Sequence, residues 1–126
     1  MGNKLILHGV HGSVKGKKFI INQGESVTVG RSTKCDIILK NDPANEYDLA
    51  SNMEHSSKHF QTISRQHLKI VYHSDVKVEV EDLSANGTML DNERIDKIFL
   101  ADITTTDHTL LLGSREKFRL EWKPEL

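Results

Sequence analysis

Residues 68–82 read LKIVYHSDVKVEVED, two runs of alternating apolar and polar residues on either side of a short polar segment. Apolar side chains occupy positions 68, 70 and 72 in the first run and positions 76, 78 and 80 in the second. A period of two, rich in valine, isoleucine and tyrosine, predicts strands that bury one face. The segment His73-Ser74-Asp75 predicts the turn between them. The stretch therefore predicts two strands joined by a turn.

The same alternation continues outward from this pair toward both ends of the chain. It recurs at Leu5 and Leu7, Val27 and Val29, Ile37 and Leu39, Leu110 and Leu112, and Phe118, Leu120 and Trp122. Turn-forming residues separate the runs, and no stretch has a helical period long enough to predict a helix. Many short strands at a spacing of about 8–12 residues predict an all-β fold, either a sandwich or a barrel.

Composition and charge limit the class of protein. The chain has 126 residues, 37% of them hydrophobic and 28% charged, which predicts a single globular domain over residues 1–126. A formal net charge of -1 gives no overall field that would gather nucleic acid or an anionic membrane, so we expect neither as a partner. The single cysteine, Cys35, excludes an internal disulfide and suits a reducing compartment. We therefore expect a cytoplasmic protein, and a monomer.

One polar segment interrupts the regular spacing of the strands. Residues 40–63 read KNDPANEYDLASNMEHSSKHFQTI, with few apolar side chains and no clear period. Loops longer than about 12–15 residues are uncommon in compact domains and are usually functional or disordered. The sequence therefore predicts a long loop insertion at about residues 40–63, more mobile than the sandwich that carries it.

Three short polar clusters fall where a predicted strand meets a turn. They are Gly30-Arg31-Ser32, Ser64-Arg65-Gln66-His67 and Ser84-Ala85-Asn86-Gly87-Thr88. Each cluster alone is ordinary loop chemistry, and Asn-Gly is a common tight-turn pair because both residues tolerate positive φ. Only their combination and order carry functional information.

In this order the clusters resemble the forkhead-associated (FHA) domain family, whose pattern is Gly-Arg, then Ser-x-x-His, then a strand, then Asn-Gly-Thr. The matching segments are VTVGRSTKCDIIL (27–39), ISRQHLKI (63–70) and VEVEDLSANGTMLDNERI (78–95). The segments VHGSVKGKKFIIN (10–22) and LLLGSREKFRLEW (110–122) resemble the family's first hairpin and last strand pair. The resemblance implies an SMAD/FHA-type β-sandwich of about eleven mostly antiparallel strands. It also implies loops at one end that bind phosphothreonine peptides.

The residue types in the first two clusters suit a phosphate. Phosphothreonine carries about -1.5 to -2 charges at neutral pH and three acceptor oxygens. The planar guanidinium of Arg31 matches two such oxygens, although a surface salt bridge is its alternative role, and Gly30 before it permits close backbone approach. Ser64 offers a hydroxyl donor, and Arg65 a second cation or its amide. The resemblance makes Arg31 and Ser64 the principal phosphate contacts and Arg65 an auxiliary one.

Further residues are expected to hold the peptide or to support the site. The amide of Asn86 can bond a passing peptide main chain. The resemblance gives Thr62 a part in choosing the third residue after the phosphothreonine, and a threonine there implies no acidic preference. It makes the imidazole of His67 a brace between loops. We expect Gly87 to form the turn and the Thr88 hydroxyl to tie it internally.

Position 85 departs from the family. Many members carry threonine or serine where this chain has Ala85, so a hydroxyl on the phosphate side is missing. We expect either weaker affinity or a greater dependence on the remaining phosphate contacts.

The sequence is best interpreted as a non-catalytic module that recognises phosphothreonine in a protein partner downstream of a Ser/Thr kinase. The alternative is a module of the same fold that binds its partner independently of phosphate, through the 40–63 loop or a sheet face. A hydrolase using Ser64 and His67 is a third class, although no nucleophile motif surrounds the serine.

The sequence supports two other functions, zinc binding and nucleotide binding, even less. His55, His59, Cys35 and His67 could supply zinc ligands, but a closed zinc site usually contains tighter cysteine pairs. The segment Gly12–Lys18 lacks the spacing and the Lys-Ser/Thr ending of a nucleotide loop. We therefore expect no metal, no cofactor and no catalytic residue, and we expect Cys35 to be a buried thiol.

Overall fold

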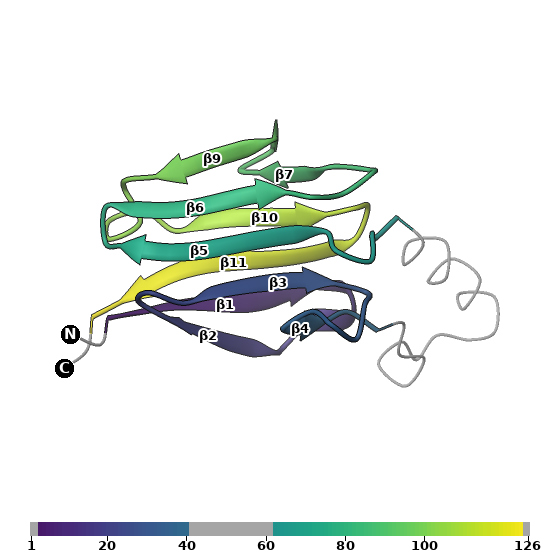
Figure 1. Ribbon diagram of the computed structural model, residues 1–126, viewed down its shortest axis with the longest axis horizontal. Helices are drawn as coiled ribbons and strands as arrows, with labels where there is room; N and C mark the ends of the chain where they lie inside the picture. Colours follow the sequence, from purple (N-terminus) through teal and green to yellow (C-terminus); the bar gives the residue numbers. More distant parts are fainter. Residues whose placement is uncertain (1–2, 41–61, 125–126) are drawn as a thin grey trace.

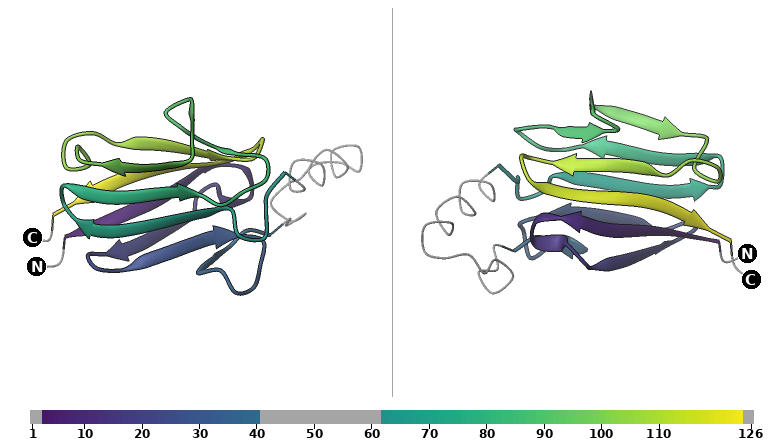
Figure 2. Two further views of the ribbon diagram at one scale, coloured as in Figure 1. Left: turned by 45° about the horizontal axis from the view of Figure 1, so that its top comes forward. Right: turned by 180° about the vertical axis from the view of Figure 1, so that it is seen from behind.

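The computed structural model describes residues 3–40 and 62–124, which form two β-sheets packed face to face (Figures 1 and 2). The described residues contain eleven strands and one 3₁₀ turn, η1 (Gly12–Val14). Most of the predicted loop insertion at about residues 40–63 lies outside the described residues. No helix in the described ranges is long and apolar enough to cross a bilayer.

The six-stranded sheet has the order β2-β1-β11-β10-β7-β8, and all its pairs are antiparallel. Its strands are β1 (Lys4–His11), β2 (Lys18–Asn22), β7 (Thr88–Leu90), β8 (Glu93–Ile95), β10 (His108–Leu112) and β11 (Glu116–Lys123). The hairpins expected from residues 10–22 and 110–122 are the β1–β2 and β10–β11 pairs.

The five-stranded sheet has the order β4-β3-β5-β6-β9. Its strands are β3 (Ser26–Gly30), β4 (Ile37–Ile38), β5 (Leu68–Ser74), β6 (Lys77–Asp82) and β9 (Lys97–Leu100). Only the β3–β4 pair is parallel among the described strands. The prediction of an all-β sandwich of about eleven mostly antiparallel strands is therefore confirmed.

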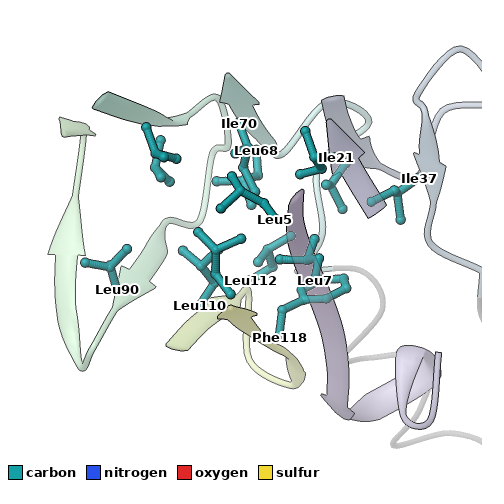
Figure 3. Packing of buried hydrophobic residues seen from close by; sticks show 14 of the residues in the cluster. Leu5, Leu7, Ile21, Ile37, Leu68, Ile70, Leu90, Leu110, Leu112 and Phe118 are labelled. Carbon is teal, nitrogen blue, oxygen red and sulfur yellow. The ribbon is translucent and has the colours of Figure 1, made fainter. Parts of the chain in front are cut away.

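The alternating apolar residues form the core between the two sheets (Figure 3). Leu5, Leu7 and Phe118 from one sheet and Leu68 and Ile70 from the other are fully buried. Burying a side chain of this size contributes about 1.5–3 kcal/mol. Because the side-chain period in a strand is two, this burial also fixes which residues of each strand face outward.

Two details of the strands differ from the sequence prediction. Placing Val76 in a strand was wrong, since it is 69% exposed in the turn before β6. The carboxylate of Asp75, beside it, accepts hydrogen bonds from the Tyr72 hydroxyl and the Trp122 indole. These bonds hold a turn at residues 75–76, where residues 73–75 were predicted. The alternation also did not single out β8 and β9.

Strand directions bring distant parts of the sequence to one end of the sandwich. In Figure 1, β3, β6 and β10 end at the right, and β5 and β11 begin there. The loops carrying the three polar clusters therefore meet at this end. The first residue of β1 pairs with the last residue of β11 at the opposite end.

Candidate functional site

Ser64, just before β5, ties together loops from three parts of the chain. Its carbonyl accepts a hydrogen bond from the backbone amide of Arg31 at 3.2 Å. Its Oγ accepts a bond from the amide of Ala85 at 3.0 Å, and its own amide donates to Nδ1 of His67 at 3.1 Å. The side chain is half-buried. The serine hydroxyl is thus held in a fixed position at the loop end of the sandwich.

Gly30 allows the first cluster to approach the second closely. A Cβ atom at this position would overlap the carbonyl oxygen of Arg65 and lie 2.7 Å from its carbonyl carbon. The group that approaches Gly30 closely is therefore the backbone of Arg65 in the same chain. Arg31 follows directly and is exposed, and its backbone amide is bonded to the Ser64 loop.

The carbonyl of Arg65 anchors the turn that follows Arg31. It accepts hydrogen bonds from the amide of Ser32 at 3.0 Å and from the buried thiol of Cys35 at 3.2 Å. The side chain of Arg65 is exposed and forms no ion pair with any residue that the structure describes. Lys34 is exposed in the same Ser32–Cys35 turn. Lys34 was not singled out from the sequence, although a second cation three residues after Arg31 was visible there.

His67 is completely buried and connects the second cluster to the third. Its Nδ1 accepts from the Ser64 amide, so the proton is on Nε2, which donates to the Gly87 carbonyl at 2.9 Å. Burial lowers the pKa of the imidazole below its ordinary value and outweighs the Gly87 carbonyl and the charge of Asp82, which raise it. His67 is therefore neutral at physiological pH.

This hydrogen bonding bears on the hydrolase and zinc alternatives. Nδ1 accepts from the backbone of Ser64, so the imidazole does not bond the serine hydroxyl as a general base would. Both ring nitrogens of His67 already have protein partners, which leaves no lone pair for a metal. His55 and His59 lie outside the described residues.

The third cluster is built around the carboxylate of Asp82. One carboxylate oxygen accepts from the Ser84 amide at 3.1 Å, the Ser84 hydroxyl at 2.6 Å and the Thr88 hydroxyl at 2.8 Å. The Ser84 hydroxyl in turn accepts from the amide of Gly87, whose φ is 102°. Sequence reasoning missed the organising role of Asp82, although Asp-x-Ser before a turn is a local capping signal.

Asn86 and Thr62 continue the site toward the β10–β11 turn. The Asn86 amide nitrogen donates to the Thr62 carbonyl at 3.1 Å, and the Thr62 hydroxyl accepts from the Ser114 amide at 3.0 Å. A Cβ at Gly113 would overlap this hydroxyl, so the β10–β11 turn lies directly against Thr62. The exposed Asn86 keeps its side-chain oxygen without a hydrogen-bond partner in the described part of the chain.

All the residues singled out from the sequence meet at one end of the sandwich through a continuous series of contacts. The residues that form these contacts are Gly30, Arg31, Thr62, Ser64, Arg65, His67, Asn86, Gly87 and Thr88. Cationic side chains and a positioned hydroxyl line the exposed side, while the buried polar groups behind them bond to one another. This arrangement suits an anionic group attached to an extended chain.

Comparison with known proteins identifies the family. The family model described as the FHA domain matches residues 27–113, a range that contains all three clusters, and the chain belongs to this family. No curated protein matches the chain.

Solved structures show the same fold. The FHA domain of the CT664 protein from Chlamydia trachomatis is 26% identical, with a TM-score of 0.65 over 94% of this chain and 96% of that one. A chain solved in an analysis of phosphothreonine-dependent FHA domain interactions is 22% identical, with a TM-score of 0.66 over 97% and 99%. EmbR of Mycobacterium tuberculosis, in complex with a low-affinity phosphopeptide, is 21% identical, with a TM-score of 0.64 over 98% and 25%.

Proposed function

We propose that this domain binds phosphothreonine in a protein partner and so docks that partner after a Ser/Thr kinase has acted on it. FHA domains are interaction modules. The observation that carries the proposal is the fixed hydroxyl of Ser64, held between the Arg31 loop and the Ala85 turn. The Ala85 amide donates to this oxygen, which leaves the hydroxyl hydrogen to donate to an anion.

Each site residue has a distinct proposed part. Arg31 forms the bidentate contact with the phosphate and Ser64 donates from the other side, with Arg65 adding charge. Hydrogen bonds to charged groups contribute about 1.5–3 kcal/mol each, so these contacts dominate the affinity. The free oxygen of Asn86 accepts from the peptide backbone. Thr62, behind Asn86, shapes the surface on which the following ligand residues lie.

Two relatives support this assignment. One structure comes from work on phosphothreonine-dependent FHA interactions, and EmbR was solved with a phosphopeptide. The proposed module is non-catalytic, since the Ser64 hydroxyl and the His67 imidazole are not bonded to one another. We further propose that it acts as a monomer in the cytoplasm.

The test compares two fluorescent peptide libraries by anisotropy, one with a fixed phosphothreonine and one with threonine. We expect binding of the phosphorylated library only. A phosphoserine library should bind about fourfold more weakly, because one buried methyl group contributes about 0.8 kcal/mol.

Two variants make this test specific to the site. Arg31→Ala should lose binding, whereas Arg119→Ala, which removes an exposed cation from β11, should not. Equal binding of both libraries, or full binding by Arg31→Ala, would instead support the phosphate-independent alternative.

A further inference from the structure

A cation outside the three clusters lies against the third one. Arg94 is in β8 and pairs with Met89 of β7. Gly87 precedes Met89 by two residues, so it is on the same face and diagonal to Arg94. The guanidinium carbon and Nε of Arg94 each lie 3.1 Å from the position that a Cβ on Gly87 would occupy. The charged end of Arg94 therefore covers the glycine beside Asn86.

Arg94 has no carboxylate partner among the residues that the structure describes. The side chain is exposed, and no carboxylate in residues 3–40 or 62–124 forms an ion pair with it. Arg115 and Arg119, by contrast, lie 3.6 Å from Glu116 and 3.9 Å from Asp107. Arg94 thus presents a planar set of donors to solvent next to the proposed binding surface.

Arg94 lies on the path that an extended peptide would follow from the proposed phosphate position. Arg31 follows β3 of the five-stranded sheet, whereas Arg94 is in an edge strand of the six-stranded sheet. The contacts between them pass through Ser64, Ala85 and Gly87. A peptide with its phosphate at Arg31 and Ser64 and its backbone at Asn86 continues over Gly87 to Arg94. An extended chain advances about 3.3–3.6 Å per residue, so Arg94 is reached within a few residues.

We propose that Arg94 binds an anionic side chain of the ligand, on the Asn86 side of the phosphothreonine. The proposal rests on the proposed function and assigns a specificity-determining residue to the same site. A guanidinium pairs with a carboxylate or with a second phosphate through the same two parallel hydrogen bonds. The preferred partner is therefore a peptide with acidic or further phosphorylated residues near its phosphothreonine.

The experiment uses synthetic peptides with one phosphothreonine in an alanine background. Glutamate, phosphoserine, lysine or alanine is moved through the neighbouring positions, and affinity is measured by anisotropy. At one or two positions on one side, we expect glutamate or phosphoserine to bind about two- to fivefold more tightly than alanine, as an exposed ion pair allows. A larger gain from phosphoserine than from glutamate would identify the second phosphate as the preferred group.

A charge swap tests the assignment to Arg94. Arg94→Ala should remove the preference and keep phosphate-dependent binding, and Arg94→Glu should favour the lysine peptide at the same position. That gain would also show that the variant is folded. Arg119→Glu makes the same change in net charge elsewhere and should leave the preference intact.

The possible failures are distinguishable. Phosphate-dependent binding that ignores neighbouring charges, or a preference that persists in Arg94→Ala, overturns this inference alone. Absence of binding to every phosphorylated peptide overturns the proposed function, and this inference with it.

Discussion

The two ends of the sandwich each contain a buried histidine, and the two are held in opposite ways. At the loop end, His67 bonds only backbone groups, the Ser64 amide and the Gly87 carbonyl. At the other end, where β10 begins (Figure 1), His108 bonds two carboxylates, Asp91 at 2.5 Å and Asp102 at 2.8 Å. One end is joined by neutral hydrogen bonds, and the other by ion pairs.

The pKa values follow from these partners. For His108, burial alone would lower the pKa, but the hydrogen bonds and charges of Asp91 and Asp102 raise it above its ordinary value. For His67, burial prevails and the pKa is lowered. The loop end is therefore braced without a buried positive charge. Arg31 and Arg65 are exposed at this end, and this is the difference that we connect with function.

The largest expected effect is on folding stability. His67→Ala leaves the Ser64 amide and the Gly87 carbonyl buried without their partner and opens a cavity. It should lower the free energy of unfolding by about 3–5 kcal/mol. His108→Ala should cost less, because the side chains of Asp91 and Asp102 are 45% and 53% exposed and can be hydrated. Urea unfolding measures both. Equal losses would remove the structural distinction between the two ends.

Gly30 provides the next test of how tightly the loop end is built. Gly30→Ala forces a methyl group onto the Arg65 carbonyl, so the backbone must move, and we expect a loss of about 2–3 kcal/mol together with weaker peptide binding. The control is Gly16→Ala, where a Cβ has no atom within 4 Å and only the φ of 83° is unfavourable. Its cost should be about 1 kcal/mol, without an effect on binding. Similar losses of stability and binding in both variants would contradict the close packing at Gly30.

The opposite pKa shifts predict opposite pH dependence. Because the pKa of His67 is lowered, only the unfolded state gains its proton as pH falls below about 6.5, so the contribution of His67 to stability is lost on the acid side. Because the pKa of His108 is raised, its contribution is present below about 6.5 and is lost as pH rises through the folded-state value. Histidine NMR titration should show His108 titrating above pH 6.5 and His67 remaining neutral there. Titration of both near 6.5 would contradict the assignment.

The smallest effect concerns affinity at position 85. The Ala85 amide already donates to Ser64, so Ala85→Thr adds a hydroxyl beside the proposed phosphate position without removing a bond. One additional hydrogen bond, worth about 0.5–1.5 kcal/mol, should tighten phosphothreonine binding about two- to tenfold. Ala101→Thr, at an exposed position after β9, is the matched control. An unchanged affinity in Ala85→Thr would place the phosphate away from this turn.

Much of the fold was predictable because burial in a sandwich leaves a simple period in the sequence. Leu68, Val78 and Val80 alternate with polar neighbours, and all three are fully buried. The strands β8 and β9 are short edge strands with exposed faces, so alternation marked them weakly. The β7–β8 hairpin depends on Asp91 and Asn92, whose φ values of 50° and 71° are typical of a two-residue turn.

The site was predictable as a set of residues but not as a set of contacts. The order of the three clusters indicated which side chains to examine, and the fold brings them to one end. That Gly30 accommodates the Arg65 carbonyl depends on packing between segments far apart in the chain. The bonds of Asp82 to Ser84 and Thr88 are local, and the Asp-x-Ser spacing was a signal for them. The contact of Arg94 with Gly87 could not be found from sequence because it requires the β7–β8 register.

We propose that the loop end of the sandwich, and not the His108 end, binds a phosphorylated threonine. The most direct test is a ¹H–¹⁵N NMR titration of the domain with a phosphothreonine peptide selected from the library, alongside its unphosphorylated twin. We predict that the largest shifts fall on the amides of Arg31, Ser64 and Ala85, and that they appear only with the phosphorylated peptide. Shifts centred on His108 and Asp102, or identical shifts with both peptides, would contradict it.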